Sequence, residues 1–334
     1  MLPELSTVNG ELSFSLDNTN VAPDPDYFVQ HYAEYLPRYI SKGSPSADTM
    51  RNYCNKIDSF IRWCLERKCH PLKMNDNRMR IYRDYLINKG YQNDSIQLML
   101  AATRAFFITA KKLGVIKENP MQDISAPTVR TPELINFYSL EQISEIIHVF
   151  DNEPDPFIRC RNRLIVLLMA VEGLRNVEVH RACVEDINWD ASAIMIRGKG
   201  SRGRLDPIYP SEKTFEVLKE YMQLIPADEE HPIKKDGLLT PLILSTSNFN
   251  YLGRVSRNGI RYVMNEALKA CNLKHHGHSC HVLRHSCGTN LYQKTKDLRV
   301  VQETLRQHDP KVTARYAHVN ERLSHRVTNA IVPD

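Results

Sequence analysis

The 334-residue chain lacks a long hydrophobic run, paired cysteine spacings and any internal repeat. No apolar stretch reaches the ~18 residues that would suggest a membrane-spanning helix. The polar N-terminus has no basic region followed by an apolar one, so no signal peptide is expected. The eight cysteines are scattered, which favours reduced thiols over a disulfide framework. These absences predict a cytoplasmic protein with no membrane segment.

The composition is that of an ordinary soluble globular protein. Hydrophobic residues make up 42% of the chain and charged residues 25%. The length suits about two domains of ~150 residues each. A net charge of +5 permits a nucleic-acid partner but does not require one. Composition therefore leaves the function open.

Prolines and hydrophobic periodicity divide the chain into segments. Residues 1–26 have little periodic hydrophobicity and are predicted to form an N-terminal arm. Residues 27–118 carry apolar stripes at helical spacing, which predict a helical domain. The proline-containing stretch 119–133 is predicted to be a linker, because proline stops helices. Residues 134–334 then form the second domain with a C-terminal tail.

The second domain is expected to be mainly helical with one β-hairpin. Ser139 and Gln142 have the spacing of a helix-initiating capping box. Two short β-like runs, 193–196 and 205–209, flank a basic loop rich in glycine, which predicts a hairpin. The chain after Ser211 is expected to be helical except in two Pro/Gly-rich passages, 226–239 and 245–253. The predicted fold class is mainly α, with an α+β second domain that contains a small sheet.

Several residues of the second domain together could break a phosphodiester without a metal or any other cofactor. They are Arg175 in GLRNVEV, Lys199 in IRGKGSRGRLDPI, His281 and Arg284 in HVLRH, and Tyr316 in TARYAHV. A tyrosine can attack phosphorus, and the planar fork of arginine binds two phosphate oxygens. A lysine or histidine can protonate the leaving oxygen. Each residue alone is weak evidence for a catalytic role. The prediction of phosphodiester cleavage rests on the order of all five residues and on their separation in the sequence.

With these motifs the chain resembles the tyrosine recombinases, the phage integrase and Xer-like family. Arg175 with Glu178 is similar to the family motif GLRxxE, and residues 281–285 match HxLRH. The resemblance covers most of residues 137–320. Residues 30–125 are compatible with the helical core-binding domain of that family. The resemblance therefore implies an N-terminal core-binding domain followed by a catalytic domain.

The resemblance also implies a role for each candidate residue. Tyr316 would attack the scissile phosphate to form a 3′-phosphotyrosyl bond, while Arg175 and Arg284 bind the phosphate oxygens. Lys199 would protonate the leaving 5′ oxygen, and His281 would assist proton transfer. The implied partner is double-stranded DNA, bound by a homotetramer on two sites with a dimer on each. Accessory DNA-bending proteins and a nucleoid-associated location are expected as well.

One position departs from the family pattern. The family usually has Leu-Gly-His, or Trp in place of His, nine residues before the tyrosine, and an ungapped match here gives Leu305-Arg306-Gln307. The imidazole follows one position later, at His308. Either His308 takes the role through a small shift of the helix end, or Gln307 donates a neutral hydrogen bond; His308 is the prediction. Because Arg306 replaces the glycine, a catalytically weakened DNA-binding protein of the same fold stays an alternative.

The sequence leaves two other interpretations to weigh, a topoisomerase and a metal site. A type IB-like topoisomerase uses the same residue types, but the short hairpin loop and the compact spacing from HxLRH to the tyrosine favour a recombinase. A metal site is the other interpretation, because five side chains of metal-binding types lie close together in the sequence, but their spacing matches no standard zinc motif. These side chains are Cys271, His275, His276, His278 and Cys280. Base contacts are predicted from the helices of residues 48–113 and from the basic region 254–261.

Overall fold

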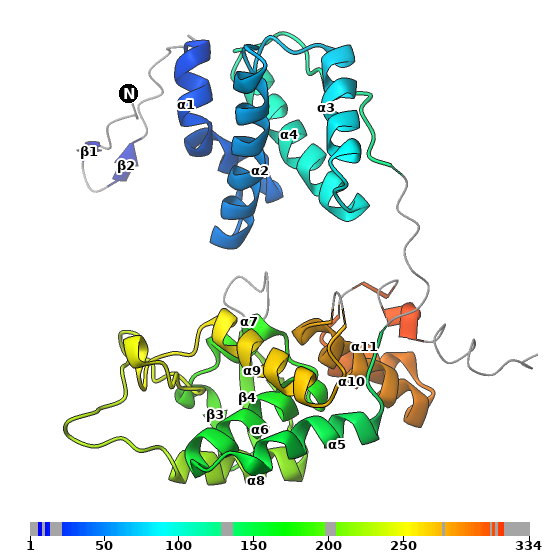
Figure 1. Ribbon diagram of the computed structural model, residues 1–334. Coiled ribbons are helices and arrows are strands. Elements are labelled where there is room, and N and C mark those ends of the chain that lie inside the picture. Colours follow the sequence, from blue (N-terminus) through cyan, green and yellow to red (C-terminus); the bar gives the residue numbers. More distant parts are fainter. Residues whose placement is uncertain are drawn as a thin grey trace, which may run out of the picture. The chain divides into compact units, whose positions relative to one another are not determined.

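The structure of the protein is a computed structural model (Figure 1). It describes residues 22–127, 136–197, 205–275, 278–307, 309–310 and 313–316. It also describes the backbone of two short antiparallel strands near the N-terminus, β1 (Ser6–Val8) and β2 (Glu11–Ser13). The chain forms two compact units that divide between Thr131 and Pro132. No helix in the described ranges is long and apolar enough to cross a membrane.

The first unit consists of helices whose starts are set by polar caps. Its helices are α1 (Pro25–Tyr35), η1 (Leu36–Tyr39), η2 (Ser41–Gly43), α2 (Ala47–Glu66), α3 (Asp76–Asn88) and α4 (Asn93–Lys112). The side chains of Asp24, Ser46 and Asn75 accept backbone N–H groups at the starts of α1, α2 and α3. Each cap satisfies a donor that has no partner inside the helix.

Helix α4 forms the centre of the first unit and packs against α1, α2 and α3. Its phenylalanines lie in a cluster of aromatic rings, with centroids 5.3 Å apart for Phe106 and Phe107 and 5.6 Å apart for Phe60 and Phe107. Tyr82 of α3 joins the cluster 5.0 Å from Phe60. Such tilted and edge-on ring pairs add to the stabilisation from buried area. The apolar stripes in the sequence therefore mark one shared core.

The second unit places a small sheet beside a group of helices (Figure 1). Its first elements are α5 (Leu140–His148), η3 (Val149–Asn152), α6 (Pro156–Ala170), α7 (Asn176–Arg181) and η4 (Val184–Asp186). The sheet contains β3 (Ile187–Asn188), β4 (Ala193–Arg197) and β5 (Leu205–Ile208) in that order, all antiparallel. The remaining elements are α8 (Glu212–Gln223), η5 (Asn248–Asn250), α9 (Arg257–Ala270), α10 (Cys280–Thr295) and α11 (Leu298–Thr304).

Helix α6 is the central element of this unit. Most of its side chains are buried, and it contacts α5, α7, α8, α9 and α10. This explains why its second half, residues 164–170, is apolar on every face rather than along one stripe. The mainly helical fold with a small antiparallel sheet confirms the predicted fold class.

The local predictions can be compared with these elements. The predicted capping box is present, because Ser139 Oγ accepts the N–H of Gln142 and Gln142 Oε1 accepts the N–H of Ser139. The predicted hairpin is also present as β4 and β5, with Ile194 opposite Ile208. Helix α1 begins at Pro25, within the last residues assigned to the arm, because Asp24 caps it there.

The expectation of helix for residues 240–244 was wrong. This segment is not helical but has a bend between two bridge residues, and its buried side chains Leu242, Ile243 and Leu244 belong to the core of the second unit. Pro241 forms a bridge with Cys183, and Leu244 forms one with Arg254. Pairing with distant chain segments therefore overrides the local helical tendency of this apolar stretch.

Candidate active site

Helix α10 contributes the HVLRH residues, and Arg284 is its buried cation. The Arg284 residue is only 4% exposed. Its Nη1 donates to the carbonyl of Gly173 and its Nη2 to the carbonyl of Leu305. Arg284 therefore links α10 to the turn before α7 and to the end of α11. Burial and the nearby Arg175 lower the pKa of Arg284 to about 10, so the guanidinium stays charged at neutral pH.

Arg175 lies at the N-terminus of α7 and is held by Glu178 one turn later. The Arg175 N–H donates to Glu178 Oε2 at 2.9 Å, and Arg175 Nη1 donates to Glu178 Oε1 at 2.7 Å. These bonds fix both the backbone and the guanidinium of Arg175. The sequence motif GLRxxE thus corresponds to a carboxylate that orients its own arginine.

Glu178 is the anion at the centre of a cluster of arginines. Its side chain is fully buried, and Arg306 Nη2 lies 3.0 Å from Oε2 while Arg284 Nη1 lies 3.8 Å from the same oxygen. Burial alone would raise the pKa of Glu178, but Arg306 and Arg175 outweigh it and hold the pKa below its usual value. The site therefore combines one carboxylate with three guanidiniums, which leaves positive charge to bind a phosphate.

Tyr316 is completely buried, and its ring packs directly against α10. A Cβ atom at Gly288 would lie 2.7 Å from Tyr316 Cζ, so only glycine allows this close approach. Burial raises the pKa of Tyr316, although a hydrogen bond with the Gln307 side chain and the charge of Arg284 oppose this effect. The hydroxyl is therefore protonated at neutral pH in the free protein.

His285 faces the tyrosine, although the sequence did not mark it as a site residue. Its Nδ1 lies 3.2 Å from the Tyr316 hydroxyl oxygen. Burial lowers the pKa of His285 to about 4, with further lowering from Arg315, His281 and Arg284. The imidazole is therefore neutral, and in one tautomer its Nδ1 can accept a hydrogen bond from the tyrosine. The final His of HVLRH was the available signal.

The other predicted site residues have different positions. His281 lies exposed on the first turn of α10, one turn before His285, and its charge acts on the His285 ring. Lys199 and His308 lie outside the described residues. Gln307, the alternative to His308, accepts a hydrogen bond from Thr313 Oγ1 at 2.9 Å, and its side chain acts to lower the pKa of Tyr316. The structure thus places an amide next to the predicted nucleophile.

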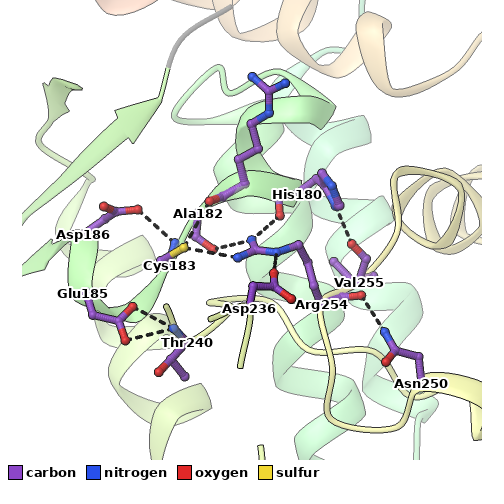
Figure 2. A network of polar contacts seen from close by, with 11 residues as sticks. His180, Ala182, Cys183, Glu185, Asp186, Asp236, Thr240, Asn250, Arg254 and Val255 are labelled. Carbon is purple, nitrogen blue, oxygen red and sulfur yellow. Dashed lines mark hydrogen bonds and ion pairs between the residues drawn. The ribbon is translucent and has the colours of Figure 1, made fainter. Parts of the chain in front are cut away.

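A separate polar network anchors the other end of α7 (Figure 2). Arg254 donates to the carbonyls of His180 and Ala182, to Cys183 Sγ and to Asp236. The Arg254 guanidinium therefore makes its hydrogen bonds within the fold. The structure does not support the prediction that Arg254 contacts DNA bases. Because α7 is only six residues long, this network holds the element that carries Arg175.

The candidate metal ligands have structural contacts instead. His278 Nδ1 lies 2.9 Å from the Tyr138 hydroxyl, and Cys280 Sγ accepts a hydrogen bond from Asn176 at 3.4 Å. His276 lies outside the described residues. Within the described part of the chain, no group of three His, Cys, Asp or Glu side chains is arranged to hold a metal ion.

Comparison with known proteins matches both units. The family "Phage integrase family" matches residues 136–322, and "Phage integrase, N-terminal SAM-like domain" matches residues 29–114. The tyrosine recombinase XerC of Thermodesulfovibrio yellowstonii is 27% identical over 297 residues, which cover 88% of this chain and 92% of the relative. XerC of Haemophilus influenzae strain PittEE is 28% identical, with 87% and 92% covered.

Solved structures share the fold at lower sequence identity. A lambda integrase dimer bound to a COC′ core site matches with a TM-score of 0.66 at 18% identity, over 89% of this chain and 78% of that chain. The XerH recombinase bound to a palindromic difH substrate, in a post-cleavage complex, also matches with a TM-score of 0.66 at 18% identity. That match covers 90% of this chain and 95% of that chain.

Proposed function

Since the chain belongs to the phage integrase family of tyrosine recombinases, we propose that Tyr316 is the nucleophile of its DNA-cleavage reaction. The protein is a site-specific tyrosine recombinase, an enzyme that cuts and rejoins DNA, and the predicted class is confirmed. The roles proposed for individual residues are supported by the geometry of those that the structure describes and by the chemistry of phosphoryl transfer.

In the proposed reaction the Tyr316 oxygen attacks the scissile phosphorus, and its hydroxyl proton passes to His285 Nδ1, which lies 3.2 Å away. A bond forms between this oxygen and phosphorus, and the bond from phosphorus to the 5′ oxygen breaks. Arg175 and Arg284 bind the nonbridging oxygens, whose charge grows in the transition state. Lys199 supplies the proton for the leaving 5′ oxygen, and His281 assists this transfer. The product is a 3′-phosphotyrosyl bond and a free 5′-hydroxyl, and rejoining is the reverse attack.

The observation that carries this proposal is the packing of Tyr316 against the HVLRH helix. The tyrosine hydroxyl lies 3.2 Å from His285 Nδ1, and Arg284 occupies the preceding position in α10. Gly288 makes room for the tyrosine ring one turn further on. Two motifs about thirty residues apart in the sequence therefore share one site, which is expected if the tyrosine works with Arg284.

The partner assignments follow from the relatives. One solved relative is a lambda integrase dimer on a core site, and another is a lambda integrase tetramer on a Holliday junction. We infer that this chain binds double-stranded DNA as a dimer on each site and as a homotetramer on two sites. DNA-bending accessory proteins and a cytoplasmic, nucleoid-associated location complete this proposal, because chromosomal or element DNA is the substrate. Binding through phosphates should weaken steeply with salt.

Two alternative functions make different predictions. A weakened DNA-binding protein would have lost contacts at the positions that depart from the family. Here, however, the Gln307 side chain acts to lower the pKa of Tyr316, and Arg306 pairs with Glu178. These contacts favour an active enzyme. A type IB-like topoisomerase would relax supercoiled DNA without exchanging strands, and the curated relatives with the recombinase name favour the other reaction.

The test is a covalent-adduct assay on DNA that flanks the gene of the protein. Purified protein is mixed with labelled, nicked duplexes tiled across those flanks, and adducts are separated under denaturing conditions. We expect a protein–DNA adduct with the wild type and none with Tyr316→Phe, which keeps the ring but removes the attacking oxygen. Binding without an adduct would instead support the weakened, binding-only protein, and an adduct that survives in Tyr316→Phe would assign the nucleophile elsewhere.

A further inference from the structure

Arg306 occupies a backbone conformation that is unfavourable for arginine. It follows α11 and has a φ angle of +50°, in the left-handed region that suits glycine. An L-residue there costs about 1 kcal/mol or more relative to glycine. The turn is useful for another reason, because it directs the carbonyl of Leu305 toward Arg284 Nη2. Glycine would serve this turn better, so the arginine side chain must contribute something that glycine cannot.

The side chain of Arg306 is directed into the arginine cluster. Only 11% of the side chain is exposed, and its Nη2 lies 3.0 Å from Glu178 Oε2. Its Nη1 donates to the carbonyl of Thr304 at 3.1 Å. The Nε atom is buried without a hydrogen-bond partner in the described residues, so the head group is desolvated at some cost. A desolvated arginine that pairs with a buried carboxylate is a fixed charge, unlike a surface ion pair.

The two carboxylate oxygens of Glu178 accept hydrogen bonds from different groups. Oε1 accepts from the Arg175 side chain, while Oε2 accepts from the Arg175 N–H and from Arg306. Arg284 lies 3.8 Å from Oε2, beyond hydrogen-bonding distance. Apart from Arg306, Arg284 is the arginine whose side chain makes its shortest contact with Glu178 at that oxygen. A closer pairing of Arg284 with Glu178 would draw it away from a phosphate.

We propose that Arg306 is a positioning residue for strand cleavage. By pairing with Glu178, Arg306 leaves Arg284 available to bind the scissile phosphate. This inference rests on the proposed roles of Arg175, Arg284 and Tyr316. Arg306 acts through Glu178 and need not touch DNA. It also adds a third positive charge to the cluster, which favours the ionised carboxylate that orients Arg175.

Substitutions at this position separate the backbone from the side chain. Arg306→Gly removes the side chain and keeps the left-handed turn, whereas Arg306→Ala removes the side chain and keeps the strain. Arg306→Lys retains a positive charge without the planar fork. The control is Arg299→Ala, because Arg299 is 85% exposed on α11 and pairs with Glu303 at the surface.

The measurement is single-turnover adduct formation with saturating protein, together with thermal unfolding of each variant. We expect Arg306→Gly and Arg306→Ala to cleave more slowly by a similar factor, about ten- to a hundredfold, because displaced catalytic groups cost rates of this order. Arg306→Gly should unfold at a higher temperature than Arg306→Ala. Arg306→Lys should recover part of the rate, and Arg299→Ala should match the wild type. A purely structural role would make the rates follow stability, with Gly clearly faster than Ala.

A pH series provides a second readout. The charged groups that face Glu178 are Arg175, Arg284 and Arg306. Without Arg306 the Glu178 carboxyl takes up a proton at higher pH, so the acid limb of the cleavage rate should move upward in Arg306→Gly. The inference is overturned if both Gly and Ala variants cleave at the wild-type rate, or if the acid limb does not move.

Failure of this inference can be distinguished from failure of the proposed function. If the wild type forms an adduct that Tyr316→Phe abolishes while the Arg306 variants behave as wild type, only the role of Arg306 is refuted. If the wild type forms no adduct on any DNA tested, the proposed cleavage roles fall and the inference falls with them.

Discussion

The two units differ in what they bury. In the described residues of the first unit, the buried polar side chains are Thr103 and Thr109, whose hydroxyls donate to carbonyls of their own helix. The second unit buries charged side chains as well, among them Glu178 and Arg284. Burying a charge is costly unless it is paired, so a domain that buries several has a reason other than stability. That difference locates the chemistry in the second unit.

The same comparison separates two kinds of stabilisation. The first unit is held by the packing of aromatic rings around α4, which depends on area and shape. The second unit has an apolar core around α6, and beside it a cluster in which Arg175, Arg284 and Arg306 share one carboxylate. Substitutions should therefore affect folding in the first unit and catalysis in the cluster.

The largest expected effect is on the stability of the first unit. Phe106→Ala removes a fully buried ring from the aromatic cluster and should destabilise that unit by about 3–5 kcal/mol. Ile81→Ala, at a position that is 52% exposed, is the control and should cost less than about 0.5 kcal/mol. Denaturant unfolding measures both. Equal costs for the two variants would contradict the view that the ring cluster stabilises this unit.

The next effect is on catalysis in the second unit. Arg284→Ala should slow single-turnover cleavage by about a hundredfold to a thousandfold, because it removes a cation that binds the transition-state phosphate. Rate measurements with saturating protein separate this loss from weaker DNA binding. Arg284→Lys should recover little, because an ammonium cannot reach both the Gly173 and Leu305 carbonyls in the same geometry. A variant with the wild-type rate would show that Arg284 is only structural.

A smaller effect is expected where α10 meets the nucleophile. Gly288→Ala places a methyl group 2.7 Å from Tyr316 Cζ and 2.9 Å from Leu305 Cδ1. Overpacking of this kind costs about 1–3 kcal/mol, and the displaced ring should also slow cleavage. Unfolding is compared in the wild type and in a Tyr316→Ala background, where part of the cost should disappear. An identical cost in both backgrounds would mean that the two residues are not in contact.

The smallest effect is a pH dependence that comes from His285. Its pKa is lowered to about 4, so the unfolded chain binds the proton more readily than the folded protein does. This contribution to stability is therefore present above a pH of about 6.5 and is lost as the pH falls toward the folded value. The change should be on the order of 1 kcal/mol, since the ring is partly exposed. Unfolding at a series of pH values should show it, and His285→Asn should flatten that part of the curve.

Much of the fold was predictable because it depends on local patterns. The first unit is helical as its apolar spacing predicted, and α3 begins where the side chain of Asn75 caps it. The capping box at Ser139 and the hairpin were predicted for the same reason. The segment 240–244 was mispredicted, because its conformation is determined by pairing with Cys183 and Arg254.

The candidate site was predictable only in part. Motif order identified Arg175, Arg284 and Tyr316, and the structure brings their elements together around α10. The contact of Arg306 with Glu178 spans 128 positions of sequence, and no local pattern predicts it. Arg254 lies in a region that was predicted to contact DNA bases. A sequence does not show whether a basic side chain faces solvent or, as Arg254 does, hydrogen-bonds within the protein (Figure 2).

The most direct test of the central claim is to identify the residue that carries the DNA. The adduct is treated with nuclease and then with trypsin, which cuts after Arg315 and after Arg322 and so releases a peptide in which Tyr316 is the only tyrosine. Tandem mass spectrometry locates the nucleotide remnant. The account predicts a 3′-linked remnant on Tyr316. A remnant on any other residue, or on a 5′ phosphate, would contradict it.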